Sequence, residues 1–158
     1  MTTTHASAYS PSSILPPRGL LLALVAQLPL IATHWPLAPG VFEALAGSAL
    51  VVAAAILNVW AARLFERQSV GICPFSPTPA LVTRGTFTLS RHPMYVGLVA
   101  LSVGLTLLTG VLPNLWISVA FAIWLHHAYV LPEERFLRDR FGAAYDEYAR
   151  RVPRWLLE

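Results

Sequence analysis

The stretch MYVGLVALSVGLTLLTGVL, residues 94–112, contains no charged side chain and decides the fold class. A helix that crosses the hydrocarbon core of a bilayer needs about 20 predominantly apolar residues, with roughly 17 to 25 tolerated. Three further apolar runs occur along the chain: Gly19–Trp35, Gly40–Leu64 and Leu115–Leu131. The first and last of these are at the short end of that range. The sequence therefore predicts an all-α integral membrane bundle of four transmembrane helices.

The composition supports a bilayer environment. The chain has 158 residues, of which 56% are hydrophobic and only 12% are charged. Soluble domains carry roughly 25% charged residues on average. The first residues, 1–17, are rich in Thr, Ser, Ala and Pro, which predicts a disordered tail. Residues 18–158 then form a single membrane-embedded domain. A signal peptide in the first run is disfavoured, because no small-residue cleavage site follows it cleanly.

The arginines predict the orientation of the bundle. The chain has 11 basic residues, and all of them are arginine. They lie before the first run, at the end of the second run or between it and the third, and after the fourth: Arg18; Arg63, Arg67, Arg84 and Arg91; Arg135, Arg138, Arg140, Arg150, Arg151 and Arg154. The other two connections carry none. Positive residues favour the cytoplasmic side, so we expect both termini in the cytoplasm. We also expect the protein to reside in the inner (plasma) membrane of a prokaryote.

Two polar clusters fall on the predicted cytoplasmic side, where Arg91-His92-Pro93 precedes the third run and Glu133-Glu134 follows the fourth. Free N–H groups at a helix start can receive an anion, and Arg91 adds a fixed positive charge. His92 and Tyr95 are three residues apart and share a helical face. For the first cluster, the alternative is a loop anchored by an interfacial Tyr95 and a snorkelling Arg91. For the second, it is two solvated carboxylates at a helix start. Polar groups at the edge of a membrane segment nevertheless favour a binding site.

The residues after the fourth run predict a cytoplasmic amphipathic helix. Leu137, Phe141, Tyr145, Tyr148 and Val152 recur at spacings that place them on one face of a helix. Such a helix packs on the bundle or lies at the interface.

Metal and nucleic-acid sites are not expected from the residue pattern. Cys73 is the single cysteine, which excludes a cysteine-based zinc site. His126 and His127 are adjacent and point about 100° apart on a helix, so they make a poor chelate. The arginines bracket apolar segments and do not form a basic patch with interleaved aromatic residues, so no nucleic-acid partner is expected.

Two spaced blocks resemble the membrane methyltransferases typified by isoprenylcysteine carboxyl methyltransferase. The blocks are Leu81-Val82-Thr83, Gly85, Arg91-His92-Pro93, Tyr95-Val96-Gly97 and Gly104, followed by Glu133-Glu134, Phe141-Gly142, Tyr145, Tyr148 and Arg151-Val152-Pro153. Phosphatidylethanolamine N-methyltransferases share a looser version of both. The resemblance covers about residues 80–155, roughly half of the chain.

The resemblance implies an S-adenosylmethionine cofactor at the cytoplasmic edge. Leu81 and Val82 would flank its adenosine, His92 and Tyr95 would contact it, and Pro93 and Gly97 would shape the backbone around it. We assign Glu134 to the cofactor, and Arg91 and Glu133 to the acceptor as catalytic residues that orient a carboxylate or take a proton from an amine. The residues themselves do not decide which carboxylate meets the cofactor.

The implied acceptor is hydrophobic or prenylated and arrives from the lipid bilayer. Gly97, Ala100 and Gly104 either leave room for its tail or allow close helix packing. The same C-terminal pattern also resembles sterol reductases, which use a nicotinamide cofactor but have many more helices. A non-enzymatic scaffold or small transporter is the other alternative. A transporter is expected to place an ionisable residue at mid-membrane, whereas the cores of the four runs contain no Asp, Glu, Lys or Arg.

Overall fold

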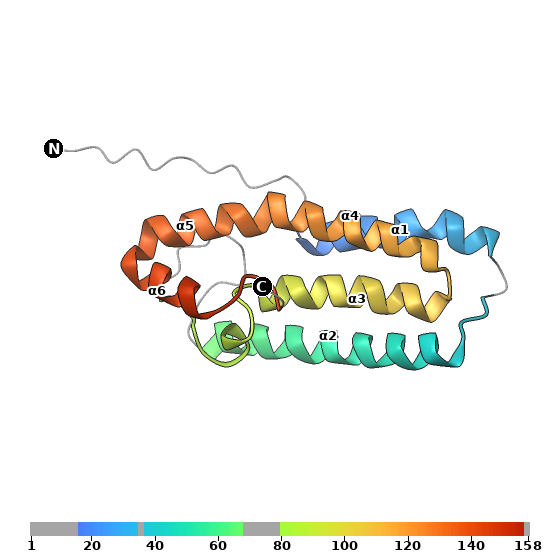
Figure 1. The fold of residues 1–158 in the computed structure, drawn as a ribbon, viewed down its shortest axis with the longest axis horizontal. Coiled ribbons are helices and arrows are strands. Elements are labelled where there is room, and N and C mark those ends of the chain that lie inside the picture. The colour runs from blue at the N-terminus through green and yellow to red at the C-terminus, as the bar shows by residue number, and fades with distance from the viewer. Residues whose placement is uncertain (1–15, 35–36, 68–79, 157–158) are drawn as a thin grey trace.

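The computed structural model describes residues 16–34, 37–67 and 80–156, and every regular element in these ranges is helical. Four helices run alongside one another and form the bundle: α1 (Pro16–Thr33), α2 (Val41–Arg67), α3 (Pro93–Thr109) and α4 (Leu115–Leu125) (Figure 1). The shorter elements are η1 (Gly85–Thr88), η2 (Leu112–Asn114), η3 (His126–Val130), α5 (Leu131–Phe141) and α6 (Ala143–Arg151). Helix α3 contacts α1, α2 and α4, so it is the central helix.

The predicted all-α membrane bundle is confirmed. Within the described residues, α1, α2 and the continuous helical stretch Leu112–Phe141 are long and apolar enough to cross a membrane, and α3 is a shorter apolar helix of 17 residues. The predicted tail overlaps the structure only at Pro16 and Pro17, which already belong to α1. The rest of that tail and Cys73 lie outside the described residues.

The fourth apolar run and the helix after it are continuous in the structure, with no break between them. Helix α4 continues through a π-helical turn, η3, into α5, and the three elements appear as one long helix in Figure 1. Pro132 has no N–H and cannot donate the backbone hydrogen bond that an α-helix requires at this point. The helix widens to a π turn immediately before it, as happens at many functional sites. This continuity places Glu133 and Glu134 on a helical extension of α4.

The glycines of α3 serve helix packing. A Cβ added at Gly104 would lie 3.0 Å from the carbonyl oxygen of Gly47 in α2, and one added at Gly47 would lie 2.8 Å from the carbonyl oxygen of Gly104. A Cβ at Gly97 would lie 2.0 Å from Nδ2 of Asn58, also in α2. The space beside Gly97 and Gly104 is therefore filled by α2, and the interpretation that these two residues leave room for an acceptor tail is wrong.

The predicted single amphipathic helix after the fourth run is two helices. Gly142 has φ 52° and ψ −127°, a conformation that residues with a side chain rarely adopt, and it separates α5 from α6. The turn lets α6 bring Tyr145 and Tyr148 into buried positions. The chain then returns to the start of α3, where the backbone N–H of Arg91 donates to the carbonyl oxygen of Pro153 at 2.9 Å.

A buried polar network joins α1, α3 and α4. Oγ1 of Thr106 donates to Oε1 of Gln27 at 2.9 Å, and the hydroxyl groups of Ser102 and Ser118 lie 2.8 Å apart. These side chains are almost fully buried, as is Asn114 in η2. Uncharged hydrogen bonds of this kind fix the register of helices in an apolar surrounding.

Candidate active site

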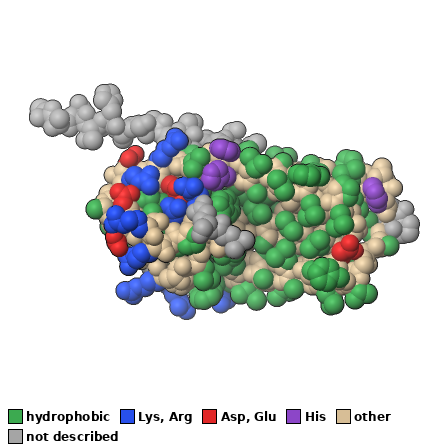
Figure 2. Space-filling view, viewed as in Figure 1, with side chains coloured by type: hydrophobic (Ala, Val, Ile, Leu, Met, Phe, Trp, Pro, Cys, Tyr) green, Lys and Arg blue, Asp and Glu red, His purple; other side chains and the backbone are tan. Residues whose placement is uncertain are grey.

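Most of the charged side chains gather at one end of the bundle. Figure 2 shows arginine, aspartate and glutamate side chains over α5 and α6, whereas the remainder of the visible face is mainly hydrophobic. Four segments meet at this end: the 80–92 segment, the start of α3, the start of α5 and the C-terminal residues 152–156. The two polar clusters that the sequence separates by about 40 residues are joined here.

Glu134 lies at the centre of the site, with a side chain only 4% exposed. Nη1 of Arg91 approaches its Oε1 at 3.0 Å. Arg154 binds both oxygens, through Nε to Oε1 at 3.0 Å and through Nη2 to Oε2 at 2.8 Å. Nε2 of His92 lies 3.4 Å from Oε1. Burying a carboxylate is costly unless it is paired and hydrogen-bonded, and here two guanidinium groups satisfy it.

Glu133 differs from its neighbour in exposure and in its partners. Its side chain is 24% exposed, and its Oε2 accepts a hydrogen bond from the hydroxyl of Tyr95 at 2.9 Å. Nδ1 of His92 lies 3.7 Å from the same oxygen, and the His92 and Tyr95 rings stack with centroids 5.6 Å apart. His92 therefore stands between the two carboxylates, and the predicted group of Arg91, His92, Tyr95, Glu133 and Glu134 is brought together.

The 80–92 segment is anchored by apolar packing on α2. Val82 and Phe87 are buried against Ala61, and the hydroxyl of Tyr148 donates to the carbonyl oxygen of Phe87 at 2.7 Å. Leu81, the other residue that the resemblance assigned to the adenosine, is partly exposed. Among the predicted cofactor residues, Val82 belongs to a core cluster, Pro93 is the first residue of α3, and Gly97 faces α2.

Two buried phenols line the C-terminal side of the site. Burial, together with the nearby Glu134 carboxylate, raises the pKa of Tyr145 to about 12. Burial, and then the neighbouring Tyr145, also raises the pKa of Tyr148. Both hydroxyl groups are therefore neutral near pH 7, which excludes them as phenolate bases.

The sequence interpretation missed Arg154. It entered only as one arginine in the orientation pattern, although it makes the bidentate contact with Glu134. Ser90 supports it by donating from Oγ to the carbonyl oxygen of Arg154 at 2.8 Å. The adjacent Glu133 and Glu134 were the signal that could have identified it. A carboxylate that becomes buried needs positive partners, and an arginine such as Arg154 can supply one. Nε1 of Trp155 donates to Nδ1 of His126 at 3.3 Å.

This geometry defines a class of protein. It is an all-helical membrane bundle with a cluster of Arg, His, Tyr and Glu side chains at one end. The family model described as phospholipid methyltransferase matches residues 42–144, which is more than half of the chain. The chain belongs to the phospholipid methyltransferase family, and the resemblance seen in the sequence is confirmed.

Curated relatives match nearly half of the chain. The chain is 42% identical over 76 residues to protein-S-isoprenylcysteine O-methyltransferase B of Arabidopsis thaliana, covering 46% of this chain and 37% of that protein. It is 44% identical over 75 residues to the A form of the same plant, covering 46% of this chain and 36% of that protein. The Schizosaccharomyces pombe protein-S-isoprenylcysteine O-methyltransferase is 33% identical over 76 residues, covering 46% and 31%. The matches thus span about a third of each relative's length, and no solved structure matches the chain.

Proposed function

We propose that this protein is an S-adenosylmethionine-dependent membrane methyltransferase that acts on a lipidic or prenylated acceptor. The observation that carries the proposal is the convergence of Arg91, His92, Tyr95 and Glu133 at one end of the bundle. These residues come from both blocks of the sequence resemblance. The names of the curated relatives supply the transferred group and support a prenylated acceptor.

The donor set fits the proposed cofactor. S-adenosylmethionine presents an ammonium, a carboxylate and a cationic sulfonium, and a carboxylate beside a histidine and an arginine offers complementary charges. The partial exposure of Glu133 supports it as the residue that receives the ammonium. The two oxygens of Glu134 already bind Arg91 and Arg154, which supports Glu134 as a positioning residue. The cofactor contact first assigned to Glu134 therefore moves to Glu133, and Glu134 takes a positioning role in place of it.

The cofactor, when bound, supplies an electrophilic methyl group for in-line displacement. Within the chain, Tyr95 and His92 hold the carboxylate of Glu133 in one orientation, and Arg91 adds positive charge next to the start of α3. Catalysis by such a site consists chiefly of positioning, which contributes several kcal/mol. Arg91 is the residue that we propose to orient an acceptor carboxylate.

We propose that the acceptor arrives through the bilayer and that both termini are cytoplasmic. Helices α3 and α4 carry no charged side chain, and their buried hydroxyl groups bond to one another or to Gln27, which favours a hydrophobic acceptor over a water-soluble one. Because α2 fills the space beside Gly97 and Gly104, the tail has to lie outside the α2–α3 contact.

The test is a methyl-transfer assay on the purified protein in lipid vesicles. Radiolabelled S-adenosylmethionine is supplied with a prenylated cysteine, and incorporation is compared between the wild type and Tyr95→Phe, which removes one hydrogen bond to Glu133. We expect labelled product from the wild type and a clear loss with the variant. A wild-type protein that neither binds S-adenosylhomocysteine nor transfers a methyl group to any lipidic acceptor would refute the proposal.

A further inference from the structure

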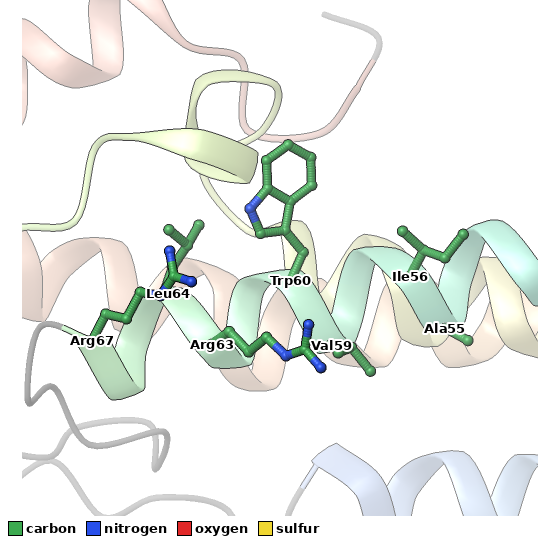
Figure 3. A pocket seen from close by; sticks show the side chains of 7 residues that line it. All are labelled: Ala55, Ile56, Val59, Trp60, Arg63, Leu64 and Arg67. Carbon is green, nitrogen blue, oxygen red and sulfur yellow. The ribbon is translucent and has the colours of Figure 1, made fainter.

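A groove lies on the face of α2 opposite its contact with α3, at the same end of the bundle as the charged site. It is lined by Ala55, Ile56, Val59, Trp60, Arg63, Leu64 and Arg67 (Figure 3). Helix α2 buries Gly47, Ala54 and Ala61, and the groove residues recur at 55, 59, 63 and 67, about half a turn away from that buried stripe. Ile56, Val59 and Trp60 are half exposed or more.

Two positive charges on this face have no acidic partner among the described residues. Arg63 and Arg67 are exposed, one helical turn apart, and neither takes part in an ion pair within the described ranges. Glu66 is the single acidic residue between Glu43 and Glu133 in the sequence. The face therefore carries a net positive charge.

The position of the Arg63 guanidinium adds a second argument. Figure 3 shows it lying alongside Val59, toward the apolar part of the helix and away from the end of α2. An uncompensated charge at the edge of the hydrocarbon region is costly. A phosphate group provides the compensation, because guanidinium–phosphate contacts are charge-assisted and often bidentate.

The dimensions of the face suit a phospholipid. Ile56 and Arg67 are eleven residues apart, or about 16 Å along the helix axis at 1.5 Å per residue. Half of a typical hydrocarbon core is about 15 Å. One acyl chain can therefore extend along Ala55, Ile56 and Val59 while its head group reaches the arginines, and Trp60 lies between the two regions, where indole rings are enriched.

We propose that the groove on α2 is a binding site for one anionic phospholipid, with its phosphate on Arg63 and Arg67 and an acyl chain along Ile56 and Val59. The site is separate from the Glu133–Glu134 cluster and does not depend on methyl transfer.

The test measures which lipid contacts Trp60. Full-length protein is reconstituted into phosphatidylcholine vesicles that contain a fixed minor fraction of either dibrominated phosphatidylglycerol or dibrominated phosphatidylcholine. The Trp60 signal is the difference in fluorescence quenching between the wild type and Trp60→Phe. An arginine near a membrane surface favours an anionic lipid by about 1 kcal/mol, or about fivefold. We therefore expect phosphatidylglycerol to be enriched at Trp60 at least about fivefold over phosphatidylcholine.

Two double variants distinguish a site from general charge. Arg63→Gln/Arg67→Gln should bring the enrichment close to one while the helical circular dichroism is retained. Arg135→Gln/Arg150→Gln removes the same net charge from exposed positions on α5 and α6 and should leave it unchanged. If the two brominated lipids quench Trp60 equally in the wild type, the proposal is wrong. It is also wrong if both double variants lose the enrichment of phosphatidylglycerol to the same extent. Absence of quenching at Trp60 also overturns it, because the face is then covered by protein, for example by a second copy of the chain.

Discussion

Arg154 is expected to hold the site together, and removing it gives a measurable loss of stability. Its guanidinium makes two charge-assisted hydrogen bonds, at 3.0 and 2.8 Å, to a carboxylate that is 4% exposed. Breaking a buried ion pair typically costs about 3–5 kcal/mol. Arg154 itself is 28% exposed, and Arg91 still compensates Glu134, so the cost should be lower. We expect Arg154→Ala to lower the free energy of unfolding by about 2–3 kcal/mol.

The assay is thermal unfolding in detergent, followed by circular dichroism. For a chain of this size, 1 kcal/mol corresponds to roughly 2–4 °C in melting temperature, so the expected decrease is about 4–12 °C. Arg151→Ala is the matched control, because Arg151 is 70% exposed and, within the described residues, its ion pair is with the exposed Glu147 at 3.4 Å. Such surface pairs contribute about 0–1 kcal/mol. If the two variants melt at the same temperature, the central role given to the Arg154–Glu134 contact is wrong.

Three further predictions concern the membrane arrangement. In a Cys73→Ser background, cysteines at Ala38 and Pro113, both exposed, should react with an impermeant reagent in intact cells, and protection of both refutes the predicted orientation. The second prediction uses an acceptor series that differs only in tail length. Each buried methylene adds about 0.8 kcal/mol, so catalytic efficiency should increase about fourfold per methylene until the tail is fully buried. Equal rates with a tail-less acceptor refute entry from the bilayer. Gly104→Leu should destabilise the bundle by about 1–3 kcal/mol through overpacking against α2, whereas Ala53→Leu on the exposed face of α2 should be nearly neutral in the same melting assay.

The apolar runs predicted the bundle well because membrane helices are defined by length and local composition. The start of α3 was also predictable, because Pro93 is its first residue and proline suits the first position of a helix. Gly142 was harder, because a glycine within a periodic pattern is tolerated in many helices. The spacing of Phe141, Tyr145 and Tyr148 continued through it, and only the tertiary packing of the two tyrosines requires the turn.

The site was predicted from two motifs that the arginine pattern assigns to the same side of the membrane. Their convergence was the part of the site that the sequence could predict. The difference in exposure and partners between Glu133 and Glu134 was not accessible, because adjacent carboxylates on a helix look alike in sequence. Their difference arises from Arg154, which reaches Glu134 from a segment that folds back over the site. The Gln27–Thr106 contact was equally hidden, since both residues lie within apolar runs and meet only when α1 packs on α3.

The most direct test of the central claim is calorimetric binding of S-adenosylhomocysteine to the purified protein. We expect the wild type to bind and Glu133→Gln to weaken binding by roughly ten- to a hundredfold, because a hydrogen bond to a charged group contributes about 1.5–3 kcal/mol. Glu147→Gln, which changes an exposed carboxylate on α6, should bind as tightly as the wild type. Absence of binding by the wild type, or an unchanged affinity in Glu133→Gln, would contradict the account.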